Sequence, residues 1–187
     1  APYTVSNYLA DQITVKVPST DSPEFEEAEK NAKALLDKFL SINGTKTAGS
    51  FHKRLGHIMW EYAGMKRNEE GLKKAKGLIA DLKKEFWSDL KIPGKMEEIN
   101  QELEKASRVA DFIDLADLIV TDALNRKESC GAHFREESMT EGGEAMRIDK
   151  DYSFVAAWEY QGEDKEPKLH KEELKFENVE VKVRSYK

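Results

Sequence analysis

The stretch Glu128-Ser129-Cys130-Gly131-Ala132-His133-Phe134-Arg135-Glu136-Glu137 lies where the pattern of the sequence changes. Before it, apolar residues recur at steps of three and four, the period of an amphipathic helix. After it come segments rich in β-branched and aromatic residues that alternate with polar ones, as strands do. We therefore expect this stretch, called the joint below, to connect a helical domain to a strand-rich tail.

Four helical patterns precede the joint, and capping or breaking residues delimit them. Asn43-Gly44 and Gly64 are typical stops, Asn68 is a typical cap, and Pro93 forbids continuation of a helix. The predicted helices span about residues 23–42, 47–63, 69–92 and 96–126. The last is apolar on two adjacent ridges, so we expect it to be the central helix of the bundle.

The apolar faces of these helices predict the core. The first helix presents Phe25, Ala28, Ala32, Leu35, Leu36 and Phe39, the third presents Leu72, Ala75, Ile79, Leu82 and Phe86, and the last presents Ile99, Leu103, Ala106, Ala110, Ile113, Val120 and Leu124 beside Val109, Phe112, Ala116, Ile119 and Ala123. The predicted fold class is mainly α, an antiparallel bundle of three to four helices followed by a small β-rich C-terminal tail.

Strand patterns lie at both ends of the chain. In the tail we predict strands at Tyr152–Tyr160 and Leu174–Tyr186, separated by a charged loop at Gly162–His170, with a bulge or bend at Glu177-Asn178. Alternation at Ile13–Val17 predicts one further strand. The chain is accordingly divided into residues 1–20, a helical bundle at 21–127, and the joint with its tail at 128–187.

Composition excludes several classes of protein. A net charge of −6 argues against a nucleic-acid partner. The single cysteine, Cys130, excludes an internal disulfide and a cysteine-pair metal site, and favours a reducing compartment. No run approaches the ~20 apolar residues of a spanning helix, so we expect contact with a membrane only through a partner.

Residues able to carry chemistry are few. His52 and His57 are five apart and thus on different helix faces, which does not suit a zinc site. His133 could titrate near neutrality but has no evident nucleophile or metal partner, and Cys130 follows a helix C-terminus, whose dipole disfavours a thiolate. We interpret His133 as structural and Cys130 as a packing residue. No glycine-rich phosphate loop is present.

One acidic residue interrupts the first ridge of the last predicted helix. A buried carboxylate at Asp117 would need a backbone donor or an arginine, and Arg108, Arg67 or Arg54 could supply the latter. We interpret it as a structural ion pair rather than as an acid–base catalyst.

Several segments, in this order, resemble the C-terminal helical domain of the flavoprotein subunit of succinate dehydrogenase and fumarate reductase. They are H-K-R-L-G-H-I-M-W at His52–Trp60, G-M-K-R-N-E-E-G-L at Gly64–Leu72, the long helix at Glu104–Arg126, the joint, and V-R-S-Y at Val183–Tyr186. The resemblance covers roughly residues 21–187, and residues 3–10 resemble the end of the flavin domain. Cys130 departs from the family, which most often has arginine there.

The resemblance implies a role within an oxidoreductase. The complete subunit would bind FAD covalently through a histidine and interconvert succinate and fumarate, with the flavin and dicarboxylate sites upstream of this chain. No catalytic, cofactor-binding or metal-binding residue of the family matches a position here, so we expect this chain alone to be inactive. The start at Ala1-Pro2-Tyr3 favours a cut inside a longer protein, although removal of an initiator methionine would leave the same start.

The resemblance also implies partners and a location. These are the flavin domain of the same subunit, an iron–sulfur subunit and, indirectly, a cytochrome b membrane anchor, in a cytoplasmic complex on the inner side of the cell membrane. We predict domain docking at Ser129, Gly131, Ala132, His133 and Arg135, because small residues permit close approach and the other side chains supply donors. The alternative is that these residues only end the helix and turn the chain.

Two other functions remain open. The chain could be a stand-alone helical-bundle interaction module that shares only ancestry with the flavoproteins. It could also be the C-terminal domain of a related flavoenzyme such as L-aspartate oxidase, which shares the joint but usually lacks so long a strand-rich tail.

Overall fold

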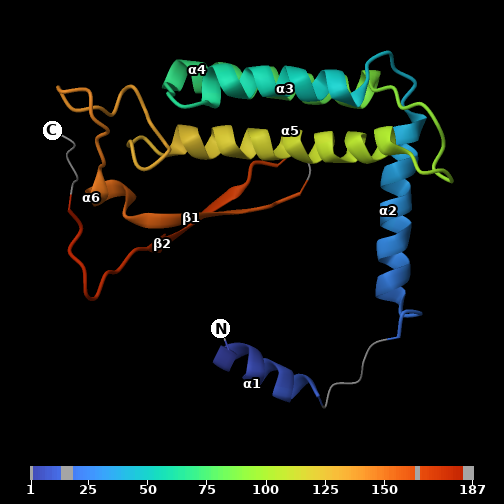
Figure 1. Cartoon of the computed structure of the whole chain (residues 1–187), viewed down its shortest axis with the longest axis horizontal. Helices are drawn as coiled ribbons and strands as arrows, with labels where there is room; N and C mark the ends of the chain where they lie inside the picture. Colours follow the sequence, from blue (N-terminus) through green and yellow to red (C-terminus); the bar gives the residue numbers. More distant parts are fainter. Residues whose placement is uncertain (1, 14–18, 163–164, 183–187) are drawn as a thin grey trace.

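The computed structural model describes residues 2–13, 19–162 and 165–182 (Figure 1). Within them the chain forms helices and then a short antiparallel sheet. The elements are α1 Pro2–Gln12, α2 Pro23–Ser41, α3 Ala48–Ala63, α4 Glu69–Asp89, α5 Gln101–Asn125, α6 Asp149–Tyr152, β1 Phe154–Glu159 and β2 Lys168–Glu173. The prediction of a mainly helical fold with a small β-rich tail is confirmed.

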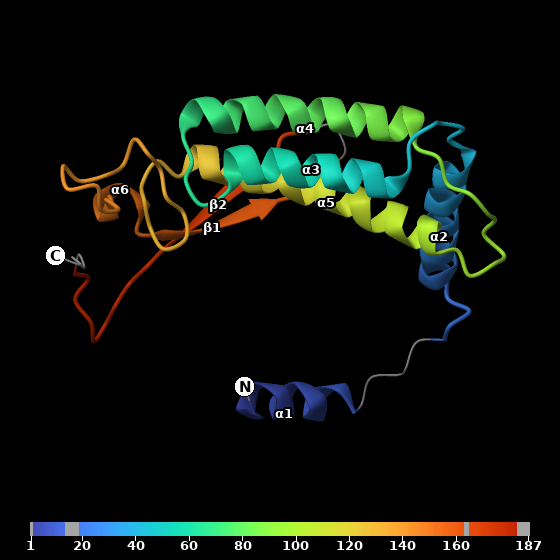
Figure 2. The same cartoon turned by 45° about the horizontal axis from the view of Figure 1, so that its top comes forward.

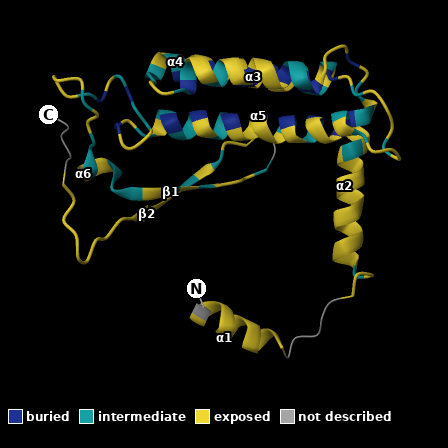
Figure 3. Ribbon diagram, in the orientation of Figure 1, coloured by how far each residue is buried: buried dark blue, intermediate teal, exposed yellow. Residues whose placement is uncertain are grey.

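Helices α3, α4 and α5 form an up-down-up bundle that contains the core (Figures 1 and 2). On these three helices the buried positions lie on the sides that face one another (Figure 3). On α4 the buried residues are the five predicted ones, Leu72, Ala75, Ile79, Leu82 and Phe86. On α5 they are Leu103, Ala106, Val109, Ile113, Ala116, Val120 and Ala123, taken from both predicted ridges.

The starts of the bundle helices are set by side-chain caps. Thr47, Asn68 and Asn100 each accept a hydrogen bond from the backbone N–H three residues later. The last helix therefore begins at Gln101 rather than near residue 96, because Asn100 caps it while its Nδ2 donates to the Pro93 carbonyl at 3.0 Å. Ile99, predicted on the first ridge, is 99% exposed before the helix.

Helix α2 projects from one end of the bundle (Figure 1). Only its last turns contact the core: Phe39 is buried and its ring stacks on Trp87 with centroids 5.1 Å apart. The prediction that the whole apolar face packs is therefore wrong within this chain, since Phe25 and Leu35 are 49% and 44% exposed. The reason is geometric, because the bundle ends beside the last turns of α2.

The tail differs from its prediction in the position of its second strand. Strand β1 confirms the first predicted strand, and it pairs antiparallel with β2 in the register Trp158↔Leu169. Strand β2 lies in the segment predicted as a charged loop, whereas residues 174–182 form no strand but do bend at 177–178. Backbone pairing with β1 gives residues 168–173 their strand structure, and across this pair Glu159 accepts from His170 at 2.6 Å.

The tail lies along α5 because Trp158 Nε1 donates to Asp122 Oδ1 at 2.8 Å. The predicted N-terminal strand falls mostly on residues 14–18 and the R-S-Y segment on 183–187, both outside the described residues. Among the helices described, none is both long and apolar enough to cross a bilayer. The boundaries at residues 20 and 127 stay predictions.

Candidate functional site: the joint between α5 and the tail

The joint closes on itself through Ser129 and Arg135. The Ser129 hydroxyl accepts from the Arg135 backbone N–H at 2.8 Å and donates to the Arg135 carbonyl at 3.1 Å. Between them Cys130 and His133 exchange two backbone hydrogen bonds of 2.9 and 3.1 Å. Gly131 inside this turn has a φ of +60°, a conformation that favours glycine. The positive φ at position 131 therefore explains why this position of the turn favours glycine.

Arg135 links the end of α5 to the start of α4. Its Nη1 donates to the carbonyl of Ala123 at 2.8 Å, and its Nε donates to Glu137 Oε2 at 3.0 Å. The other oxygen of Glu137 accepts from the backbone N–H of Glu69, the first residue of α4, at 2.6 Å. A cation thus lies at a helix C-terminus and a carboxylate at a helix N-terminus, the favourable sign at each end.

The ionisation of Glu137 follows from these contacts. Burial acts to raise the pKa of this carboxyl, but hydrogen bonds from the Glu69 backbone N–H, from its own N–H and from Arg135 outweigh burial, and the pKa is lowered. Glu137 therefore stays ionised at the start of α4 at neutral pH.

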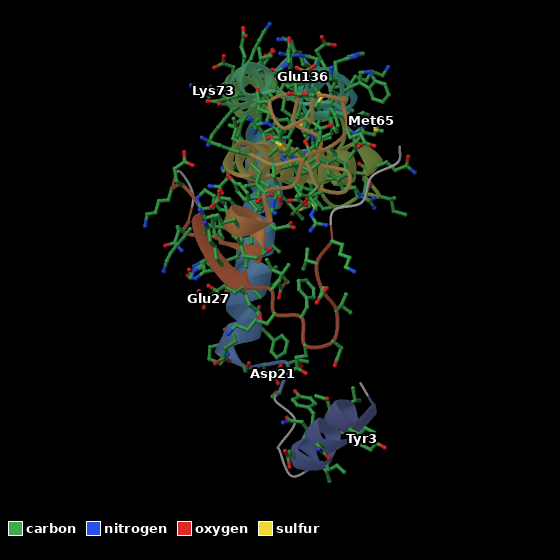
Figure 4. The ribbon with its side chains drawn as sticks, turned by 90° about the vertical axis from the view of Figure 1, so that its left-hand side faces the viewer. Tyr3, Asp21, Glu27, Met65, Lys73 and Glu136 are labelled. Atoms are coloured by element: carbon green, nitrogen blue, oxygen red, sulfur yellow. The ribbon has the colours of Figure 1, made fainter. Side chains whose placement is uncertain are left out.

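The turn between α3 and α4 is paired with the joint. Arg67 donates its backbone N–H to the joint at 2.9 Å and accepts from the Glu136 N–H at 2.8 Å. Glu136 also accepts from Asn68 Nδ2 at 2.6 Å, which orients the residue that caps α4. Figure 4 looks onto this end of the molecule, where Glu136 lies between Lys73 and Met65.

His133 is held in one neutral form. A guanidinium can only donate, so Arg67 Nη1, 3.0 Å from His133 Nδ1, makes that nitrogen the acceptor. Nε2 then carries the proton and donates to the Arg126 carbonyl at 2.8 Å. Burial lowers the pKa of His133, and the nearby charge of Arg67 acts in the same direction. The interpretation of His133 as a structural residue agrees with this geometry.

Arg126 and Glu128 attach the tail to the bundle. Arg126 Nη1 contacts Glu128 Oε1 at 2.5 Å, and the guanidinium donates to the carbonyls of Tyr152 at 3.1 Å and Phe154 at 3.0 Å. Glu128, which is buried, accepts from the Ile148 backbone N–H through its other oxygen at 2.8 Å. The tail therefore starts from a fixed position at the end of α5.

The residues predicted for docking separate into two groups. Ser129 and Arg135 are buried in contacts with the rest of this chain, so within it they hold the joint together rather than form its surface. Gly131 and Ala132 are exposed, and His133 is half-buried. A docking role thus stays a prediction, and its accessible part is the tip of the turn. Cys130 is exposed, so its interpretation as a packing residue is wrong: the turn places it outside.

The other candidates do not join this site. The His52 ring lies against Phe112, with centroids 5.5 Å apart. The predicted arginine partners of Asp117 are engaged elsewhere, Arg54 with Glu85, Arg108 with Glu104 and Arg67 with His133, so the predicted arginine pairing is wrong. Burial raises the pKa of Asp117, despite the nearby charge of Lys76.

No metal centre is formed by the His, Cys, Asp and Glu side chains of the part of the chain that the structure describes. The sequence does not predict the contacts of three residues in or beside the joint, namely Arg126, Glu128 and Glu137. Their positions beside helix ends could have indicated these contacts, because ionisable side chains there can hydrogen-bond to the unpaired carbonyls and N–H groups of a helix. Their other partners, namely Glu69, Ile148, Tyr152 and Phe154, lie too far away in sequence to be predicted from it.

Comparison with known proteins agrees with this geometry. The family model described as fumarate reductase flavoprotein C-term matches residues 52–186. An uncharacterised FAD-dependent oxidoreductase of Methanocaldococcus jannaschii is 30% identical over 140 residues, 70% of this chain and 25% of that protein. The fumarate reductase flavoprotein subunit of Haemophilus influenzae is 26% identical over 131 residues, 70% of this chain and 22% of that protein.

A solved structure has the same fold. FrdA of the E. coli quinol fumarate reductase superposes with a TM-score of 0.75 at 20% identity, over 90% of this chain and 27% of that one. The chain thus spans about a quarter of the length of the relatives it matches. It belongs to the family of succinate dehydrogenase and fumarate reductase flavoproteins, and corresponds to their C-terminal domain.

Proposed function

We propose that this chain is the bracing domain of a flavoprotein that interconverts succinate and fumarate and passes electrons to an iron–sulfur subunit. The observation that carries the proposal is the joint, in which Arg135 links α4 to α5 and Arg126 fixes the tail. Three elements are thereby fixed relative to one another around a turn whose tip is exposed. A rigid arrangement of this kind suits a domain that packs against other domains and fixes their positions.

We propose that the catalytic and flavin-binding residues lie outside this chain. A dinucleotide site of the usual kind needs a strand, a glycine-rich turn and a helix of a parallel sheet, whereas the described residues form one antiparallel pair of strands. The described residues therefore do not form the kind of site that binds FAD. Members of the family are flavoproteins, and we propose that the parent protein attaches FAD covalently through a histidine upstream of this chain.

The proposed partners follow from the same assignment. The tip of the joint turn, Gly131 and Ala132 with the half-buried His133, would contact either the flavin domain of the same subunit or an iron–sulfur subunit. A cytochrome b anchor would be contacted only indirectly, and the complex would lie on the cytoplasmic side of the cell membrane.

The experiment that tests the function is an immunoblot of native extract and membranes with antibody against this 21.3 kDa chain. We expect a much larger, membrane-associated band with acid-stable flavin fluorescence. A flavin-free band at the size of the chain would favour the stand-alone interaction module. As a second test, the pure chain is incubated with FAD and dialysed, and retained flavin absorbance would contradict the proposal that the flavin site lies elsewhere.

A further inference from the structure

Helix α2 carries an apolar stripe that this chain leaves half covered. Phe25, Ala28, Ala32, Leu35, Leu36 and Phe39 share one face, and we call the first four of them the α2 stripe. Phe39 is 1% exposed against the core, but all four residues of the α2 stripe are exposed (Figure 3). The described residues thus cover the end of the apolar face that adjoins the bundle and leave the rest open.

The composition of the α2 stripe suits packing rather than solvent. Glu29 lies at the edge of this face, and Lys30 and Lys33 occupy the other side of the helix. Ala28 and Ala32 lie between the larger Phe25 and Leu35, so another backbone can approach closely at the middle of the stripe. In proteins a helix gains most of its stability from packing an amphipathic face of this kind.

We propose that the N-terminal portion of the parent flavoprotein, about three quarters of its length, packs on the α2 stripe. This inference rests on the proposed function. The chain covers only 25% and 22% of two relatives and corresponds to their C-terminal part, so most of such a subunit precedes α2. Helix α1, the segment leading to that portion, lies with the free end of α2 on the side of α5 opposite to α3 and α4 (Figure 1).

Exposed side chains of α1 support the same occupant. Tyr3, Tyr8 and Leu9 of α1 are more than half exposed. Apolar side chains are therefore open on two consecutive helices, α1 and α2, that both lie away from the core of this chain. A single large neighbour on this side would cover both, which a small ligand would not.

The test compares hydrogen exchange of residues 24–35 in the full-length polypeptide and in this chain. We expect these amides to exchange about tenfold or more slowly in the full-length polypeptide, because packing adds to the free energy of opening the helix. Ala32→Glu should remove the added protection, since it places a carboxylate in the contact. Ala34→Glu is the matched control, the same change two residues away on the opposite, exposed face.

Both variants should leave the unfolding of this chain alone unchanged, which shows that neither breaks α2 itself. If Ala32→Glu prevents folding of the full-length polypeptide, Phe25→Ala provides the same test with a smaller change and an effect in the same direction.

Four outcomes decide the inference. Slower exchange that Ala32→Glu alone abolishes supports it. Equal exchange in a full-length polypeptide that holds flavin overturns the docking site and leaves the proposed function intact. Slow, concentration-dependent exchange in this chain alone overturns it in favour of a second copy. A full-length product without flavin overturns the proposed function and this inference together.

Discussion

The Nη1 atom of Arg135 lies 2.8 Å from the carbonyl oxygen of Ala123 and donates a hydrogen bond to it. Arg135 is 2% exposed, so this hydrogen bond is shielded from water. It lies at the end of α5, where the last carbonyls of a helix have no partner within the helix. Through Glu137 the same side chain reaches the first N–H of α4. The start of α4 and the end of α5, which are far apart in sequence, are thereby joined.

Replacing the buried arginine should destabilise the chain. Arg135→Met removes the charged donor and leaves the Ala123 carbonyl unpaired, so we expect the free energy of unfolding to fall by about 2–4 kcal/mol. Urea unfolding followed by circular dichroism measures the loss. Arg108→Met is the matched control, because Arg108 pairs with Glu104 on the surface of α5 and its loss should cost at most about 0.5 kcal/mol. Equal losses for the two variants would contradict the structural role of Arg135.

The state of His133 predicts a pH dependence. Burial lowers its pKa from the usual 6.5, so below pH 6.5 the unfolded chain binds more protons than the folded one. This contribution to stability is complete above pH 6.5 and is lost as pH falls through the lowered pKa. Unfolding free energies at pH 7.5 and 5.5 measure it.

His133→Asn should flatten this pH dependence. His57→Gln, which changes an exposed histidine of α3, should leave it as in the parent chain. A slope that survives in His133→Asn would show that another group is responsible.

The close approach of Gly44 to α4 predicts a strong effect of one methyl group. A Cβ at Gly44 would lie 2.0 Å from the backbone carbon of Asp89, so Gly44→Ala must displace the segment that joins α2 to α3, at a cost of about 2 kcal/mol or more. Gly77→Ala, in α4 with nothing within 4 Å of its Cβ position, should instead stabilise by about 0.5–1 kcal/mol. Thermal unfolding distinguishes the two, and a neutral Gly44→Ala would contradict the close approach.

The exposed tip of the joint turn predicts a variant that affects association and not stability. Ala132→Glu in the full-length subunit should reduce the amount of iron–sulfur subunit that copurifies, or loosen the flavin domain, while this chain alone unfolds as before. The reason is that a new charge in a small-residue contact must be desolvated. Ala145→Glu, at another exposed position of the tail, is the control. Unchanged copurification and unchanged proteolysis of the flavin domain would leave the turn with a structural role only.

Helix ends and buried faces are predicted correctly where the residues that determine them are close together in sequence. Asn68 as a cap, Gly64 as a stop and the three-four spacing of α4 each predicted an observed helix end or buried face. The start of α5 was misplaced by five residues, because Asn100 competes for the cap with the polar residues before it. Strand β2 was missed, since Lys168–Glu173 has little alternation and gains its structure from pairing with β1.

The sequence by itself determined the helices, their caps and the place of the joint, because these depend on residues three or four apart. Only the tertiary structure decided that Arg135 would be buried on the Ala123 carbonyl, that Cys130 would lie outside, and that α2 would leave its first turns open. These outcomes depend on which helix or strand packs beside each residue. That packing brings together segments distant in sequence, and no pattern of residues three or four apart encodes it.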